Sequence, residues 1–92
     1  MIRSFRHKGL GRFFATGDKS GIRPDHAGRL RILLTALDHA VQPEDLGAPS
    51  WRLHPLKGDL RGFWSLTVQA NWRIVFRFAG KDIELVDYID YH

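Results

Sequence analysis

Two short segments hold most of the side chains that could carry out acid–base chemistry. Residues 54–59 read His-Pro-Leu-Lys-Gly-Asp, and residues 90–92 read Asp-Tyr-His. Histidine titrates near neutral pH and can act as a general base or acid, while arginine can stabilise a phosphate that gains charge. This inventory fits the cleavage of RNA without a metal ion. A base would deprotonate the ribose 2′-hydroxyl, a cation would stabilise the phosphorane, and an acid would protonate the leaving 5′-oxygen.

Other kinds of catalytic site fit the sequence less well. The chain has no cysteine, which excludes disulfides, thiolate metal sites and cysteine nucleophiles. It also lacks the Gly-x-Ser-x-Gly elbow that presents a nucleophilic serine. His54, His92 and Asp90 could ligate a metal ion, but no His-x-x-x-His or similar spacing supports that assignment. On composition alone, ordinary surface groups remain a better-supported interpretation of these residues than a catalytic site.

The positive charge of the chain is concentrated in two segments. The 14 Lys and Arg residues outnumber the 10 Asp and Glu residues, which gives a net charge of +4 at pH 7. Residues 1–12 and 51–80 each sum to +4, whereas residues 32–50 and 81–92 each sum to −3. Ten of the cations are arginine, whose planar guanidinium suits bidentate contact with phosphate. This distribution predicts a polyanionic partner.

The hydrophobic pattern predicts two helices followed by a sheet. An apolar stripe at helical spacing covers residues 7–16, and a longer one follows Pro24 and extends to Val41. From residue 51 the period changes to two, which predicts strands over residues 51–54, 63–69, 71–78 and 83–88. Residues 2–5 are expected to form a short opening strand. The chain of 92 residues is therefore predicted to be one α+β domain, with its long helix on the apolar face of an antiparallel sheet.

The same period of two places polar side chains on one face of this sheet. In the strand over residues 71–78, three polar residues share a face: Asn71, Arg73 and Arg77. For Arg77, plain solvation of an outer strand face explains the position equally well. Arg52 and His54 share a face in the strand predicted over residues 51–54. Trp72 has the opposite parity and is predicted to be buried under the long helix, the alternative being that it stacks on an RNA base.

In order and spacing, several segments resemble the HigB-type killer toxins of the RelE superfamily. The matching segments are SFRHKGL at residues 4–10, the turn at 17–21, LHPLKGD at 53–59, GFWS at 62–65, NWRIVFRF at 71–78 and DYH at 90–92. The resemblance therefore extends over nearly the whole chain. Two positions differ from some relatives: Leu60 and Ile89 are apolar, whereas those relatives have charged residues there. That difference bears on base preference and surface contacts.

The resemblance implies a RelE-like fold, in which two N-terminal helices pack on a twisted, largely antiparallel sheet. It also implies the site residues. His54 and His92 would be the catalytic imidazoles, with Asp90 and Tyr91 supporting His92. In an extended chain Asp90 and His92 point to the same side, so the final residues are expected to belong to the mechanism. Arg73 would stabilise the scissile phosphate, and the predicted RNA-binding residues are Lys57, Asn71, Arg52, Arg61 and Arg77.

The activity implied by the resemblance is ribosome-dependent cleavage of mRNA in the A site, with no cofactor and no metal. The implied partners are the 70S ribosome, mRNA and a HigA-like antitoxin with a helix-turn-helix domain. Operator DNA would be bound only through the toxin–antitoxin complex. On the ribosome, the cations of residues 1–12 would contact rRNA and those of residues 51–77 would face the cleavage site. The toxin alone is expected to be a monomer.

Two alternatives remain. RelE-fold toxins of the ParE kind poison DNA gyrase and are not nucleases, but they have no evident use for the paired histidines. A non-catalytic RNA-binding module of the same fold would need only the basic charge. The N-terminus has no signal-peptide core, and no apolar run approaches the ~18 residues of a membrane span. We therefore expect a cytoplasmic protein without a membrane partner.

Overall fold

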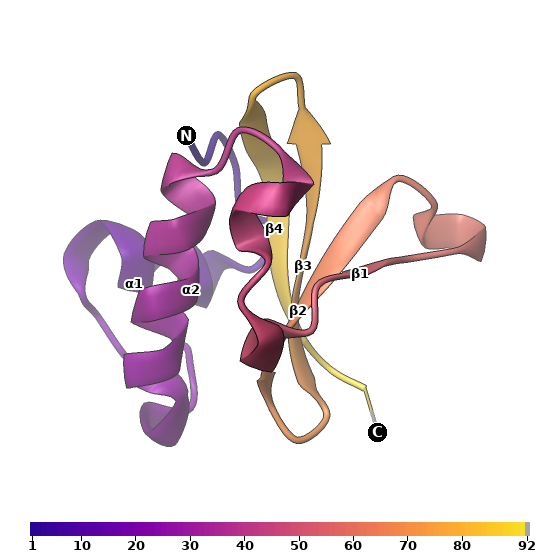
Figure 1. The fold of residues 1–92 in the computed structure, drawn as a ribbon. Coiled ribbons are helices and arrows are strands. Elements are labelled where there is room, and N and C mark those ends of the chain that lie inside the picture. The colour runs from indigo at the N-terminus through magenta and orange to yellow at the C-terminus, as the bar shows by residue number, and fades with distance from the viewer. Residues whose placement is uncertain (92) are drawn as a thin grey trace.

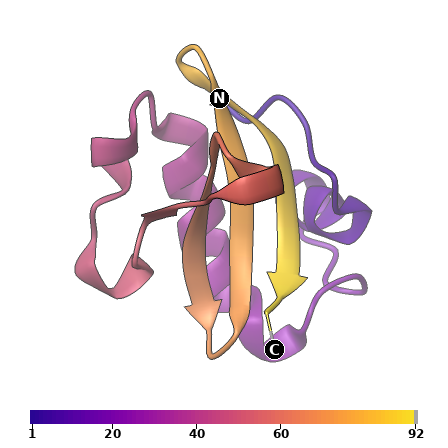
Figure 2. The ribbon, with the colours of Figure 1, turned by 90° about the vertical axis from the view of Figure 1, so that its right-hand side faces the viewer.

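The computed structural model describes residues 1–91, which form two helices and a four-stranded sheet. The helices are α1 (Lys8–Thr16) and α2 (Ala27–His39). The strands are β1 (His54–Pro55), β2 (Phe63–Gln69), β3 (Trp72–Ala79) and β4 (Asp82–Asp90). Both helices lie on one side of the sheet, and the segment between β1 and β2 projects from the other side (Figures 1 and 2). The predicted α+β architecture is confirmed.

The first helix begins and ends at residues that satisfy its free backbone groups. Nδ1 of His7 accepts a hydrogen bond from the N–H of Leu10 at 3.0 Å, and Gly17 ends the helix with a φ of 81°. Gly9 packs against the backbone of Gly21, where a Cβ on Gly9 would come within 2.6 Å of the Gly21 carbonyl oxygen. The close approach requires glycine, even though glycine lowers helix propensity.

The second helix supplies the centre of the core. Its buried stripe consists of Ala27, Leu30, Leu33, Leu34 and Leu37. A 3-10 turn over Pro24–His26 precedes it, as expected for proline at the first position of a helical segment. The helix ends at His39, so Val41 lies beyond it and is exposed. Within residues 1–91, no helix is long and apolar enough to cross a membrane.

The strands follow one another in the order β1-β2-β3-β4, and each neighbouring pair is antiparallel. The N-terminal segment runs beside β4 (Figure 2). It is joined to β4 by two isolated parallel bridges, Ile2 to Ile83 and Phe5 to Val86. The opening segment predicted over residues 2–5 is therefore part of the sheet, although it forms bridges and not a regular strand. As a result, β4 is a central strand.

The strand predicted over residues 51–54 has the wrong bounds. Trp51 ends a 3-10 turn, and Arg52 follows with a φ of 50°, a left-handed conformation that a strand excludes. The observed β1 contains only His54 and Pro55, and beyond it the N–H of Leu56 still donates to the carbonyl oxygen of Phe63 at 2.9 Å. Proline has no N–H, which suits it to an edge strand. Arg52 and His54 are therefore placed by a turn and not by strand alternation.

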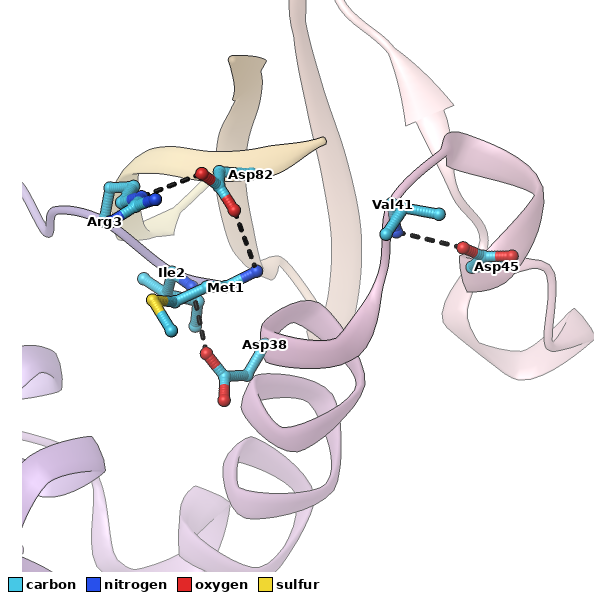
Figure 3. A network of polar contacts seen from close by, with 7 residues as sticks. All are labelled: Met1, Ile2, Arg3, Asp38, Val41, Asp45 and Asp82. Carbon is cyan, nitrogen blue, oxygen red and sulfur yellow. Dashed lines mark hydrogen bonds and ion pairs between the residues drawn. The ribbon is translucent and has the colours of Figure 1, made fainter. Parts of the chain in front are cut away.

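Two carboxylates attach the N-terminal segment to the rest of the fold (Figure 3). The Met1 amino group lies 3.3 Å from Oδ1 of Asp82, and Nε of Arg3 lies 2.8 Å from Oδ2 of the same residue. On α2, Oδ1 of Asp38 accepts a hydrogen bond from the N–H of Ile2 at 2.9 Å. The segment is thus attached to both β4 and α2.

The acidic segment over residues 32–50 uses carboxylates to bind backbone N–H groups. Besides the contact of Asp38 with the N-terminal segment, Oδ2 of Asp45 accepts a hydrogen bond from the N–H of Val41 at 3.0 Å (Figure 3). Asp38 lies on α2, on the helix side of the sheet. Its negative charge is therefore on the side opposite the strand face that carries Arg73.

Candidate active site on the open face of the sheet

The sheet has one face packed on the helices and one open face. On β3, Ile74 and Phe76 are fully buried in the core, whereas Arg73 and Arg77 have the opposite parity and lie on the open face. Val75 shares the parity of the arginines but is only 2% exposed, so an apolar patch separates them. The predicted sorting of polar and apolar residues along this strand is confirmed, apart from Val75.

A cleft of about 500 Å³ opens on this face. Four of the candidate residues line it: Arg52, His54, Arg73 and Tyr91. The remaining wall is formed by Leu53, Leu56, Ser65 and Thr67. These residues come from β1 and the segments beside it, from β2 and β3, and from the residue that follows β4. The sheet therefore brings together groups that are up to about 40 positions apart along the chain.

The guanidinium of Arg73 is held by the turn between β2 and β3. Its Nη1 donates to the carbonyl oxygen of Ala70 at 2.6 Å and to that of Trp72 at 3.0 Å. Ala70 has a φ of 51°, in the left-handed region that is sparsely populated for a non-glycine residue. Among residues 1–91, Nε and Nη2 of Arg73 have no hydrogen-bond partner, so this edge retains donors for a phosphate oxygen.

His54 and Arg52 form the opposite wall of the cleft. His54 lies on the short edge strand β1, where it pairs with Ser65 of β2, and its side chain is exposed. Arg52 precedes it by two residues and is also exposed. Because β1 is the outermost strand of the sheet, the imidazole is at the sheet edge with access for a large substrate.

The residues after β4 reach the same cleft from the other side. The N–H of Tyr91 donates to the carbonyl oxygen of Asn71 at 2.9 Å, and the Tyr91 side chain is 42% exposed. The side chain of Asn71 is exposed on the turn. Its backbone carbonyl thus gives Asn71 a structural function in addition to the predicted contact with RNA.

The sheet places Asp90 on the side opposite the cleft. It pairs with Trp72, whose ring packs toward the helices, and residues opposite one another in a ladder share a face. Burial is the main cause that raises the pKa of Tyr88, and the negative charges of Asp25 and Asp90 add to it. His92, predicted to share a side with Asp90, lies outside the described residues. Support of His92 by Asp90 stays a prediction.

The other predicted RNA-binding residues lie outside the cleft. Lys57 and Arg61 are exposed on either side of the 3-10 turn Gly58–Leu60, which projects from the open face (Figure 1). Arg77 is at the far end of β3 and forms an ion pair with Glu84 of β4. The structure therefore separates the cations of residues 51–80 into a group in the cleft and a group beside it.

Sequence reasoning missed Arg29, which joins two walls of the cleft from behind the sheet. Its Nη2 donates to the carbonyl oxygens of Ser50 at 2.8 Å and Thr67 at 3.1 Å, and its Nε is buried without a hydrogen-bond partner in residues 1–91. The only sequence signal was a cation on α2, outside the leucine stripe. Ser50 leads into Arg52, so Arg29 fixes the start of the loop that carries the cleft residues.

Sequence reasoning also missed His26, which is 2% exposed. Its Nδ1 lies 2.5 Å from the hydroxyl oxygen of Tyr88, and its ring packs edge-on against Trp72. The centroids of the Trp72 and Tyr88 rings lie 4.6 Å apart. Burial raises the pKa of the Tyr88 phenol. Trp72 lies in this cluster on the helix side of the sheet, as its parity predicted, but it is half-buried and not fully buried.

Comparison with known proteins identifies related sequences over the whole chain. A family model described as the RelE-like toxin of type II toxin–antitoxin system HigB matches residues 3–92. The endoribonuclease HigB of Proteus vulgaris is 46% identical over 92 residues, which is 100% of this chain and 100% of the relative.

Solved structures with low sequence identity share the fold. YafQ from E. coli has a TM-score of 0.65 at 16% identity, with 96% of this chain and 89% of YafQ covered. The YoeB–YefM complex from Staphylococcus aureus has a TM-score of 0.63 at 18% identity, with 100% of this chain and 95% of the matched chain covered. With the family match and the 46% identity, these results show that the chain belongs to the HigB family of RelE-like toxins of type II toxin–antitoxin systems.

Proposed function

We propose that this chain is an endoribonuclease toxin that cleaves mRNA in the ribosomal A site and thereby stops translation. The convergence of His54, Arg73 and Tyr91 on one open cleft is the observation that carries the proposal. The full-length similarity to a relative named as an endoribonuclease supports the nuclease activity. An exposed cleft suits a single-stranded substrate that a larger RNA assembly presents.

In the proposed reaction, two imidazoles carry out both proton transfers. One of His54 and His92 accepts the proton of the ribose 2′-hydroxyl, and the 2′-oxygen attacks phosphorus. The other protonates the 5′-oxygen as its bond to phosphorus breaks, which leaves a 2′,3′-cyclic phosphate and a 5′-hydroxyl. Arg73 donates to the non-bridging oxygens as they gain charge. The two residues before His92 are proposed to support it, Tyr91 from within the cleft and Asp90 from the opposite side of the sheet. No step of this reaction uses a metal or a cofactor.

Three further cations and Asn71 are proposed to bind the RNA. Arg52 lines the cleft, whereas Lys57 and Arg61 are on the projecting segment between β1 and β2. Asn71 is exposed on the turn next to Arg73, where its amide can contact a base. Each is in reach of an RNA strand that lies across the open face.

The family membership supports an antitoxin partner. We propose a helix-turn-helix antitoxin that binds this toxin and recruits the pair to operator DNA. The free toxin is proposed to be a monomer that acts in the cytoplasm, where it meets the 70S ribosome and mRNA.

Mapping of mRNA 5′ ends by primer extension, on purified ribosomes without antitoxin, tests this function. Wild-type protein is expected to produce new ends within the A-site codon. Arg73→Ala and His54→Ala are expected to lower the cleavage rate by about 10²–10³ at equal soluble concentration. Arg31→Ala and His39→Ala are matched controls, because both residues lie on α2, away from the cleft.

Three outcomes would contradict the proposal. Wild-type cleavage by Arg73→Ala would remove this residue from the mechanism. RNA binding without new ends would indicate a non-catalytic module. In cells, an arrest of DNA replication before translation would favour a gyrase poison.

A further inference from the structure

Two arginines from distant parts of the chain contact one phenyl ring on the open face. The guanidinium carbons of Arg6 and Arg77 each lie 5.4 Å from the centroid of the Phe63 ring. The ring is only 7% exposed, whereas both arginine side chains are exposed. Cation–π contact with a fixed ring limits the motion of both guanidinium groups. Phe63 therefore holds two cations near each other at the surface.

The charges of this cluster are only partly compensated. Arg77 donates from Nε to Glu84 at 2.8 Å. Among residues 1–91, no carboxylate lies within ion-pair distance of Arg6. The other arginines of the basic N-terminal segment differ, because Arg3 pairs with Asp82 and Arg12 with Asp18. Two cations with one carboxylate leave net positive charge, and an anion bound between them would relieve their repulsion.

The cluster continues the surface that contains the cleft. Arg77 pairs with Phe63 across the ladder, and Arg73 pairs with Thr67 in the same two strands. Arg73 and Arg77 are four residues apart on one face, a separation of about 13 Å along the strand. A strand of RNA that leaves the cleft along β3 would therefore reach the cluster.

We infer that Arg6 and Arg77, supported by Phe63, form a phosphate-binding subsite for the RNA strand that is being cut. The inference rests on the proposed function and extends it to a residue of the N-terminal segment. Guanidinium groups bind phosphate through paired N–H donors, and their planar faces can also stack on bases. In this proposal Arg6 contacts the mRNA strand, and not rRNA as expected for the cations of residues 1–12.

Equilibrium binding of short RNAs to the free protein tests this subsite. The probes are 2′-O-methyl RNAs of about 4 and about 12 nucleotides, which have no 2′-hydroxyl to attack. Fluorescence anisotropy is expected to show tighter binding of the longer RNA by wild-type protein. Arg6→Gln and Arg77→Gln are each expected to lower affinity for the longer RNA about tenfold, with a smaller effect on the shorter one. Each is also expected to reduce the salt slope by about 0.7, the value for one phosphate of a single strand.

Arg3→Gln is the matched control, because it removes the same charge from the same segment at a residue paired with Asp82. Phe63→Leu keeps both charges and is expected to lose part of the affinity, since the guanidinium groups lose their common support. On ribosome-bound mRNA, Arg6→Gln is expected to raise KM more than it lowers kcat.

The inference fails if Arg6→Gln and Arg3→Gln weaken binding equally, or if Arg6→Gln weakens binding to ribosomes but to neither RNA probe. The second result would assign Arg6 to rRNA. Failure of the proposed function is a separate result, because it would appear as unchanged cleavage by Arg73→Ala.

Discussion

The backbone N–H of Tyr91 donates a hydrogen bond to the carbonyl oxygen of Asn71 at 2.9 Å. This bond joins the segment after β4 to the turn between β2 and β3. The preceding residue of that turn, Ala70, accepts a hydrogen bond from Arg73. Two adjacent carbonyl groups therefore hold both the candidate phosphate ligand and the C-terminal segment, so the turn determines their relative position.

Replacing Tyr91 by proline or by alanine separates the two functions of this residue. Both variants lose the phenol ring, but only Tyr91→Pro loses the N–H that binds Asn71. A hydrogen bond of this kind contributes about 0.5–1.5 kcal/mol, so Tyr91→Pro is expected to cleave about 2- to 13-fold more slowly than Tyr91→Ala. Single-turnover cleavage on ribosomes measures the difference. Equal rates would show that the anchor does not matter for activity.

Replacing Arg73 by lysine tests whether a positive charge is sufficient. Lysine presents a compact ammonium and cannot bind both turn carbonyls while offering a second pair of donors to phosphate. Arg73→Lys is therefore expected to remain impaired at least tenfold, with a melting temperature close to that of the wild type. Recovery of the full cleavage rate by lysine would reduce the function of Arg73 to that of a point charge.

Removing the Arg29 guanidinium is expected to destabilise the protein. Arg29→Met leaves the carbonyl groups of Ser50 and Thr67 without this donor, at a cost of about 1–3 kcal/mol in the free energy of unfolding. Arg31→Met is the control, because Arg31 lies on the same helix and its guanidinium carbon lies 5.4 Å from the centroid of the Phe13 ring. Urea denaturation of both variants gives the comparison, and equal midpoints would contradict a special function for Arg29.

Truncating Trp72 tests its assignment to the core. Its ring packs on Tyr88 and His26, so Trp72→Ala is expected to cost about 3 kcal/mol in the free energy of unfolding. Trp72→Phe keeps an aromatic ring and is expected to recover most of that loss. A Trp72→Ala protein that melts like the wild type and binds RNA poorly would instead support base stacking.

The ion pairs of Asp82 predict a specific acid dependence of stability. The hydrogen bond from Arg3 lowers the pKa of the Asp82 carboxyl below its usual value, and the Met1 amino group adds to this effect. Because the folded-state pKa is lower, the ionised carboxylate stabilises the fold above about pH 4, and this contribution is lost as the pH falls further. The difference in melting temperature between wild type and Asp82→Asn is expected to be present at pH 7 and to shrink below about pH 4.

The chemical character of the molecule is encoded locally in its sequence. The leucines of α2 recur at helical spacing and are buried, because one face of any helix with that pattern must leave water. Arg73 alternates with Ile74 along β3, so its position on the opposite face follows from the period of a strand. The order of the short motifs also predicts the family, which the full-length similarity confirms.

What only the tertiary structure decided are the relationships between segments. Alternation places residues on a face, but it does not say which residue of a neighbouring strand lies beside them. The contact of Arg6 with Phe63 depends on how the N-terminal segment joins β4, and the contacts of Arg29 depend on how α2 crosses the sheet. Asp90 faces away from the cleft because of its pairing with Trp72. Such contacts depend on the strand register, on the irregularities in the β2–β3 and β3–β4 ladders and on the left-handed turn at Ala70. The hydrophobic period of a single segment does not encode any of these three features.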